Sequence, residues 1–208
     1  MGQYEAVLFD FDGVLVDSEP VHFGCWQEIL TPFGIDLDWK TYSEHCIGIA
    51  DRAMLTFLCS CKTPTLDVEL LVAEYPRKKE LFRERMGKIG VAAEVADLVR
   101  ELRGEYRLGV VTSSNIREVG DILQDSGLMP LLDTVVHGGD VRRHKPAPDP
   151  YLLALERLGV KSALAVEDSA AGIAAARAAG LDVVEIPQAS EVSPLVRARL
   201  QLGTKTFL

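Results

Sequence analysis

The sequence has no excess of positive charge and no long hydrophobic run, and each absence excludes a class of function. Lys and Arg together number 22 against 31 Asp and Glu, which gives a formal net charge of -9 at pH 7. A protein that binds nucleic acid needs a basic surface to neutralise phosphates, so we expect no nucleic-acid partner. No run of about 18 apolar residues is present, so we expect no transmembrane helix and no membrane partner.

Secretion and disulfide signals are also missing. The first residues contain no basic segment followed by an apolar one, so no signal peptide is predicted. The four cysteines lack the spacing of a metal site, and reduced, partly buried thiols are the favoured interpretation. They are Cys25, Cys46, Cys59 and Cys61. We therefore expect a cytoplasmic protein, and we expect it to be a monomer.

The order of apolar runs and helical patterns predicts an α/β fold. Short apolar runs typical of buried strands occur at 6–9, 108–112, 134–136, 163–166 and 183–186. From the second run onward they alternate with helical patterns at 93–103, 116–126, 150–158 and 170–179. Glycines near the ends of these helices are expected to take the left-handed conformation that closes a helix: Gly104, Gly127, Gly159 and Gly180. This alternation is typical of a Rossmann-like, doubly wound parallel sheet, in which ligands bind beyond the carboxyl ends of the strands.

The segment between the first two strands has a different character. It contains no convincing strand and many helix-forming residues, so we interpret it as a small helical bundle inserted after the first strand. The predicted domains are an α/β core formed by 1–17 and 87–208, and a helical cap formed by 18–86. Placed after a strand that carries candidate catalytic residues, such an insert suggests a lid.

Two carboxylates follow the first strand directly. Asp10 and Asp12 lie two residues apart, and Gly13 comes next and permits a sharp turn. At a separation of about 5 Å and an effective dielectric of about 20, two such charges repel by about 3 kcal/mol. A divalent cation, or a proton on one carboxyl group, would relieve this repulsion. The alternative is an ordinary polar turn at the end of a strand.

Hydroxyl groups follow the second strand, at the start of a predicted helix. Thr112, Ser113, Ser114 and Asn115 combine side-chain oxygens with the free N–H groups of a helix N-terminus, which together suit a phosphate group. Simple capping of the helix by Ser or Asn is the alternative.

The third and fourth strands are followed by charged residues. Lys145 lies in a proline-rich loop that would hold its ammonium group at a fixed point, unless it is only a solvated lysine. Glu167 and Asp168 follow the fourth strand and are suitable ligands for a hard cation, unless Asp168 only caps a helix. Because all four groups follow successive parallel strands, we expect them to meet in a phosphoryl-transfer site. There Asp10 attacks phosphorus, Asp12 transfers protons, and Lys145 and Mg²⁺ neutralise charge.

Four motifs in this order resemble those of the haloacid dehalogenase superfamily: DFDGVLVD, VVTSSN, HKPAPDPYL and VEDSAAGIAAARAAG. The helical insert resembles the cap of the subgroup that contains β-phosphoglucomutase and the sugar-phosphate phosphatases. The resemblance implies that Asp10 is the nucleophile and Asp12 the general acid and base, with Thr112 and Lys145 as phosphate ligands. It also implies Mg²⁺ bound by Asp10, the backbone carbonyl of Asp12, Glu167 and Asp168. Further candidates for phosphate or substrate binding are Gly13, Ser113, Ser114, Asn115, His22, Gly48 and Arg52.

The cap sequence favours a phosphatase over a mutase. The mutase carries a lysine immediately before the glycine that corresponds to Gly48, and this chain has Ile47 there. Without that lysine, the phosphate that is not transferred loses a contact that a bisphosphate intermediate needs. Arg52 could still contact a substrate phosphate or carboxylate. We therefore expect Mg²⁺-dependent hydrolysis of a small phosphorylated metabolite such as a sugar phosphate, with a phosphosugar mutase as the alternative.

Two non-enzymatic alternatives are disfavoured. A receiver-type phosphoacceptor also combines acids, a hydroxyl and a lysine on a parallel sheet, but it is much shorter. In a receiver, the phosphorylated aspartate ends an inner strand, whereas Asp10 follows the first strand of this chain. A long insert then follows Asp10. A binding protein without activity is disfavoured because every position needed for the chemistry is filled.

Overall fold

The computed structural model describes residues 3–47, 51–86 and 89–202. The chain forms two compact units, one made of Met1–Asp17 with Ile89–Leu208 and the other of Ser18–Lys88.

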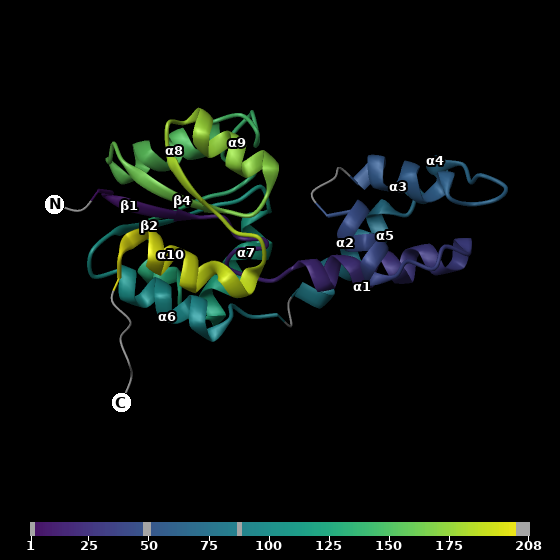
Figure 1. Cartoon of the computed structure of the whole chain (residues 1–208), viewed down its shortest axis with the longest axis horizontal. Helices are drawn as coiled ribbons and strands as arrows, with labels where there is room; N and C mark the ends of the chain where they lie inside the picture. The colour runs from purple at the N-terminus through teal and green to yellow at the C-terminus, as the bar shows by residue number, and fades with distance from the viewer. Residues whose placement is uncertain (1–2, 48–50, 87–88, 203–208) are drawn as a thin grey trace. The chain divides into compact units, whose positions relative to one another are not determined.

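The first unit is built on a parallel five-stranded sheet, as predicted (Figure 1). The strands are β1 (Ala6–Phe9), β2 (Arg107–Val111), β3 (Thr134–Val136), β4 (Ala163–Glu167) and β5 (Asp182–Glu185). Their order in the sheet is β3-β2-β1-β4-β5. Every residue of β1 and β4 is buried, because helices cover both faces of the sheet; both strands are apolar except for Glu167, the last residue of β4.

Helices complete a layered α/β arrangement around this sheet. They are α6 (Ala93–Leu102), α7 (Ile116–Asp125), α8 (Asp149–Leu158), α9 (Ala170–Ala178) and α10 (Val192–Leu200), with the short 3₁₀ turns η2 (Met129–Leu131) and η3 (Ala189–Glu191). In Figure 1, α8 and α9 lie on one side of the sheet, and α6 and α10 lie on the other. The strands and helices predicted from the sequence agree with these bounds to within one residue.

Two details differ from the sequence prediction. Gly127, Gly159 and Gly180 have positive φ values of 70°, 66° and 81°, but Gly104 is not among the residues with positive φ. The chain leaves α6 through Arg103, which keeps right-handed helical angles, so no left-handed residue is required there. In addition, α10 has no counterpart among the helices predicted from the sequence, because its apolar signal is limited to a few residues such as the buried pair Val192 and Val196.

The second unit contains helices and no strand among its described residues. It contains α1 (Glu19–Leu30), η1 (Thr31–Phe33), α2 (Trp39–His45), α3 (Asp51–Ser60), α4 (Val68–Val72) and α5 (Tyr75–Met86). A separate apolar core holds it together, with Trp26, Ile29, Leu55 and Leu71 among its buried members. The thiols are free as expected; Cys61 is exposed and the other three are buried. Across the described part of the chain, no helix combines the length and apolar content that crossing a bilayer requires.

Because β1 is the central strand, its side chains are expected to dominate the stability of the first unit. Leu8 is fully buried, and Leu8→Ala should lower the free energy of unfolding by about 2–5 kcal/mol through lost burial and an unfilled cavity. Leu152→Ala is the matched control, because Leu152 is 48% exposed and should change stability by no more than about 0.5 kcal/mol. Urea unfolding followed by circular dichroism measures both, and equal effects of the two substitutions would contradict this description of the core.

Candidate active site

Asp10 lies at the carboxyl end of the central strand. Its backbone N–H donates to the carbonyl of Val166 on β4 at 2.9 Å, which continues the pairing of β1 with β4 for one more residue. The side chain is buried, and its Oδ1 lies 2.9 Å from Nζ of Lys145. The sheet therefore holds this carboxylate rigidly and next to a positive charge.

The turn after Asp10 requires glycine at one position. Gly13 has φ of +73°, and its N–H donates to the carbonyl of Val16 at 2.8 Å. A Cβ atom on Gly13 would lie 1.8 Å from Oδ2 of Asp168. Gly13 thus permits both the left-handed turn and the close approach of Asp168. These two requirements are sufficient reason for a glycine at this position, without a direct contact to substrate.

Lys145 joins three segments of the first unit. Its ammonium group contacts the carbonyl of Val111 at 2.9 Å, Oδ1 of Asp10, and Oε1 of Glu167. An ammonium group has three N–H bonds, and these three oxygens match them. Burial alone would lower the pKa of Lys145, but the charges of Asp10 and Glu167 outweigh it and raise the pKa above its ordinary value. Lys145 is therefore a permanent positive charge at the centre of the site.

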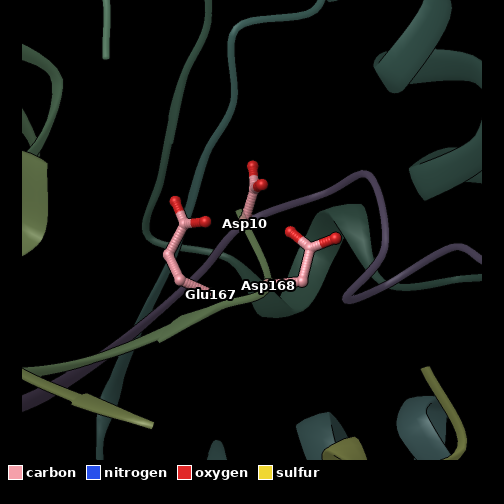
Figure 2. Close-up of side chains that lie close together, drawn as sticks. All are labelled: Asp10, Glu167 and Asp168. Carbon is pink, nitrogen blue, oxygen red and sulfur yellow. The ribbon is translucent and has the colours of Figure 1, made fainter. Parts of the chain in front are cut away.

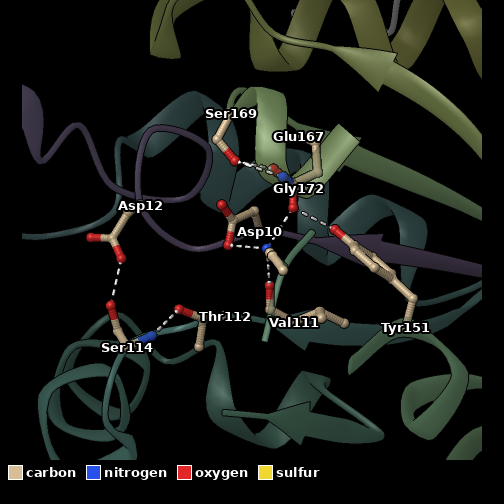
Figure 3. Close-up of polar contacts among 10 residues, drawn as sticks. Asp10, Asp12, Val111, Thr112, Ser114, Tyr151, Glu167, Ser169 and Gly172 are labelled. Carbon is tan, nitrogen blue, oxygen red and sulfur yellow. Dashed lines mark hydrogen bonds and ion pairs between the residues drawn. The ribbon is translucent and has the colours of Figure 1, made fainter. Parts of the chain in front are cut away.

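Glu167, the last residue of β4, has no solvent-exposed surface. Its Oε1 accepts hydrogen bonds from Lys145 and from the hydroxyl of Tyr151, the latter at 2.6 Å, and its Oε2 accepts one from Ser169 at 3.2 Å (Figure 3). Burial, and then the charge of Asp10, raise the pKa of Glu167, while Lys145 opposes that shift. A Cβ atom on Gly172 would lie 2.0 Å from both carboxylate oxygens, so a glycine in α9 makes room for this side chain.

Three carboxylates converge at this point, as Figure 2 shows. Asp10, Glu167 and Asp168 each offer an oxygen, and these oxygens all lie within 4.8 Å of one another. The ammonium of Lys145 pairs with two of the three, Asp10 and Glu167. Carboxylate oxygens are the ligands that Mg²⁺ prefers, and a divalent cation would offset the repulsion between neighbouring carboxylates. The donor set fits such an ion, and Gly13 and Gly172 leave room for the side chains of two of its members, Asp168 and Glu167.

The segment after β2 lies beside this cluster. Thr112 is buried, and its Oγ1 accepts a hydrogen bond from the N–H of Ser114 at 3.0 Å. The hydroxyl of Ser114 donates to Oδ2 of Asp12 at 2.6 Å. Oδ1 of Asn115 accepts a hydrogen bond from the N–H of Arg117 and so caps α7, which is the helix-capping alternative considered for this segment. Ser113 is exposed. The structure thus joins this segment to Asp12.

The remaining predicted residues belong to the helical unit. His22 lies in α1 with its Nδ1 2.7 Å from Nζ of Lys78, and burial together with that ammonium lowers the pKa of His22 to about 3. His22 is therefore neutral at physiological pH. Arg52, in α3, forms an ion pair with Glu69. Gly48 lies outside the described residues.

Sequence reasoning missed two supports of the site, Tyr151 and Ser169. Tyr151 is fully buried in α8, and its ring lies 5.4 Å from Nζ of Lys145. Burial and the charge of Glu167 raise the pKa of Tyr151 well above its ordinary value, so its hydroxyl remains a donor. The sequence does place Tyr151 on a predicted helix just after Lys145. It does not show which face of that helix packs against the sheet, so the contact with Glu167 could not be predicted.

The hydroxyl of Tyr151 should stabilise the folded protein through its bond to a buried carboxylate. We expect Tyr151→Phe, which keeps the ring, to lower the free energy of unfolding by about 1.5–3 kcal/mol, the usual value for a hydrogen bond to a charged group. Tyr106→Phe, at a partly exposed position, is the matched control with an expected change of no more than about 0.5 kcal/mol. Thermal and urea unfolding measure both, and a Tyr151→Phe protein as stable as the wild type would show that this bond contributes nothing.

Comparison with known proteins agrees with this geometry. The chain is 32% identical over 186 residues to the fructose-1-phosphate phosphatase YqaB of Escherichia coli, covering 88% of this chain and 97% of that protein. It is 32% identical over 185 residues to a phosphorylated carbohydrates phosphatase of Thermotoga maritima, covering 86% and 82%. Among solved structures, a variant of CbbY from Rhodobacter sphaeroides in complex with xylulose 1,5-bisphosphate is similar, with a TM-score of 0.63, 29% identity and coverage of 87% and 85%.

A family model for haloacid dehalogenase-like hydrolases matches residues 7–186, a range that includes every carboxylate and the lysine of the site. The family suggested by the four motifs is therefore confirmed: the chain belongs to the haloacid dehalogenase-like hydrolases.

Proposed function

We propose that this protein is a Mg²⁺-dependent phosphatase that hydrolyses a small phosphomonoester through a phosphoaspartyl intermediate on Asp10. The observation that carries the proposal is the buried contact of Asp10 with Lys145, inside a cluster of carboxylates at the end of the central strand. Burial restricts solvation of this carboxylate, and the ammonium beside it holds one of its oxygens at a fixed point, from which the side chain can attack phosphorus.

The proposed reaction has two steps, and atoms balance in each. First, an oxygen of Asp10 forms a bond to phosphorus while the bond from phosphorus to the ester oxygen breaks, and Asp12 gives its proton to that leaving oxygen. Second, Asp12 takes a proton from water, the water oxygen bonds to phosphorus, and the bond to Asp10 breaks. Phosphate leaves, and both aspartates return to their starting states. Lys145 stabilises the negative charge near Asp10 in both steps.

Asp10, Glu167, Asp168 and the backbone carbonyl of Asp12 are the proposed ligands of Mg²⁺. When bound, the ion supplies positive charge that offsets the charge of the phosphoryl oxygens and of the carboxylates themselves. The hydroxyl of Thr112 accepts from Ser114, which leaves its own proton available for a phosphoryl oxygen.

Two observations support a phosphorylated sugar as the substrate and hydrolysis as the reaction. The two relatives described above are named as phosphatases of phosphorylated carbohydrates, and CbbY is seen with a sugar bisphosphate. Ile47 stands where the mutase has a lysine. We retain 18–86 as the proposed cap domain and 1–17 with 87–208 as the proposed catalytic core.

Asp10→Asn should abolish hydrolysis of p-nitrophenyl phosphate, because an amide oxygen is a poor nucleophile for phosphorus. We expect a loss of at least about 1,000-fold in kcat with a folded protein, since Asn has the same shape. Asp121→Asn on the exposed surface of α7 is the matched control and should retain wild-type activity. Steady turnover by the Asp10→Asn protein would remove Asp10 from its proposed role.

Mg²⁺ removal tests the metal ligands independently of Asp10. Treatment with EDTA should silence the wild-type enzyme, and added Mg²⁺ should restore it. Isothermal titration calorimetry without substrate should show Mg²⁺ binding to the wild type, and Asp168→Asn should weaken it by at least about tenfold because one anionic ligand is lost. Full activity in EDTA, or equal Mg²⁺ affinity of the two proteins, would contradict the assignment.

A further inference from the structure

Ser114 contacts the residue proposed to transfer protons. Its Oγ lies 2.6 Å from Oδ2 of Asp12, and the two side chains point toward each other in Figure 3. The two residues are 102 positions apart in the sequence, so only the fold brings them together. Ser114 is one of the residues predicted from the sequence to bind phosphate, and the observed contact indicates a different role.

The backbone of Ser114 is fixed on both sides of its side chain. Its N–H donates to Oγ1 of Thr112 at 3.0 Å, and its carbonyl accepts from the N–H of Gly138 at 3.2 Å. Gly138 allows this close approach, because a Cβ atom there would lie 2.5 Å from the carbonyl oxygen of Ser113. The loop after β2 and the loop after β3 therefore hold Ser114 in place.

A serine hydroxyl has one proton to donate. While that proton is given to Asp12, it is not available to an oxygen of the substrate phosphate. The hydroxyl oxygen can also accept, so the contact can persist whether Asp12 is ionised or protonated. A partner with this property suits a carboxyl group that acts first as an acid and then as a base.

We propose that Ser114 is a positioning residue that fixes the carboxyl group of Asp12 for proton transfer to the leaving oxygen. The inference rests on the proposed phosphatase function and deepens it. Its consequence is selective: correct placement of Asp12 matters for a strongly basic leaving group, which must be protonated as it departs. It matters little for a weakly basic leaving group, which departs as an anion.

The test compares two esters of similar size, phenyl phosphate and p-nitrophenyl phosphate, whose leaving groups differ mainly in basicity. For Ser114→Ala we expect kcat/KM to fall by about 10- to 100-fold with phenyl phosphate and by less than about threefold with p-nitrophenyl phosphate. Inhibition by inorganic phosphate should be unchanged. Ser114→Thr, which keeps the hydroxyl, should recover most of the activity on phenyl phosphate.

Ser126→Ala is the matched control. Ser126 follows the last residue of α7, its hydroxyl donates to the carbonyl of Leu123 at 3.2 Å, and its removal should leave both rates unchanged. An equal loss on both esters, weaker inhibition by phosphate, or no loss at all in Ser114→Ala would overturn the positioning role while the phosphatase function stands. A wild-type protein that hydrolyses neither ester would instead overturn the proposed function.

Discussion

The site depends on one buried ammonium group. Lys145 joins the ends of three strands by contacting Val111 at the end of β2, Asp10 after β1 and Glu167 at the end of β4. Without its charge, Asp10 and Glu167 would face each other as two buried negative groups, which is costly in a medium of low polarity. The contacts of Lys145 that offset these buried negative charges also hold Asp10, the proposed nucleophile, in position.

Neutral residues also stabilise the carboxylates of the site. Tyr151 and Ser169 donate to Glu167, and Gly13 and Gly172 leave room for the side chains of Asp168 and Glu167. The buried carboxylates are thereby satisfied by hydrogen bonds, and one face of the cluster combines excess negative charge with converging oxygens. With Mg²⁺ bound, this arrangement would explain why the proposed phosphatase site contains so many acids.

Much of the fold could be predicted, because the strands of this sheet are short apolar runs bounded by polar loops. The positions of Asp10, Lys145 and Glu167 followed from the rule that the carboxyl ends of parallel strands share one edge. The roles of Tyr151 and Ser114 could not be predicted, because they depend on how α8 faces the sheet and on the approach of the Gly138 loop. The position of Asp10 does not distinguish this chain from a receiver domain, contrary to the expectation from the sequence. Because β1 is the central strand, Asp10 follows an inner strand, as the phosphorylated aspartate of a receiver does. The greater length of the chain and its helical unit remain as the differences from a receiver.

Trapping the phosphorylated enzyme is the sharpest test of the proposal that Asp10 is the nucleophile. The protein is mixed with substrate and Mg²⁺, quenched in acid, treated with borohydride to reduce any acyl phosphate to an alcohol, and digested for peptide mass mapping. The account predicts reduction at position 10 alone, and none when substrate is omitted. Reduction at a different carboxylate, or no reduction during steady turnover, would contradict it.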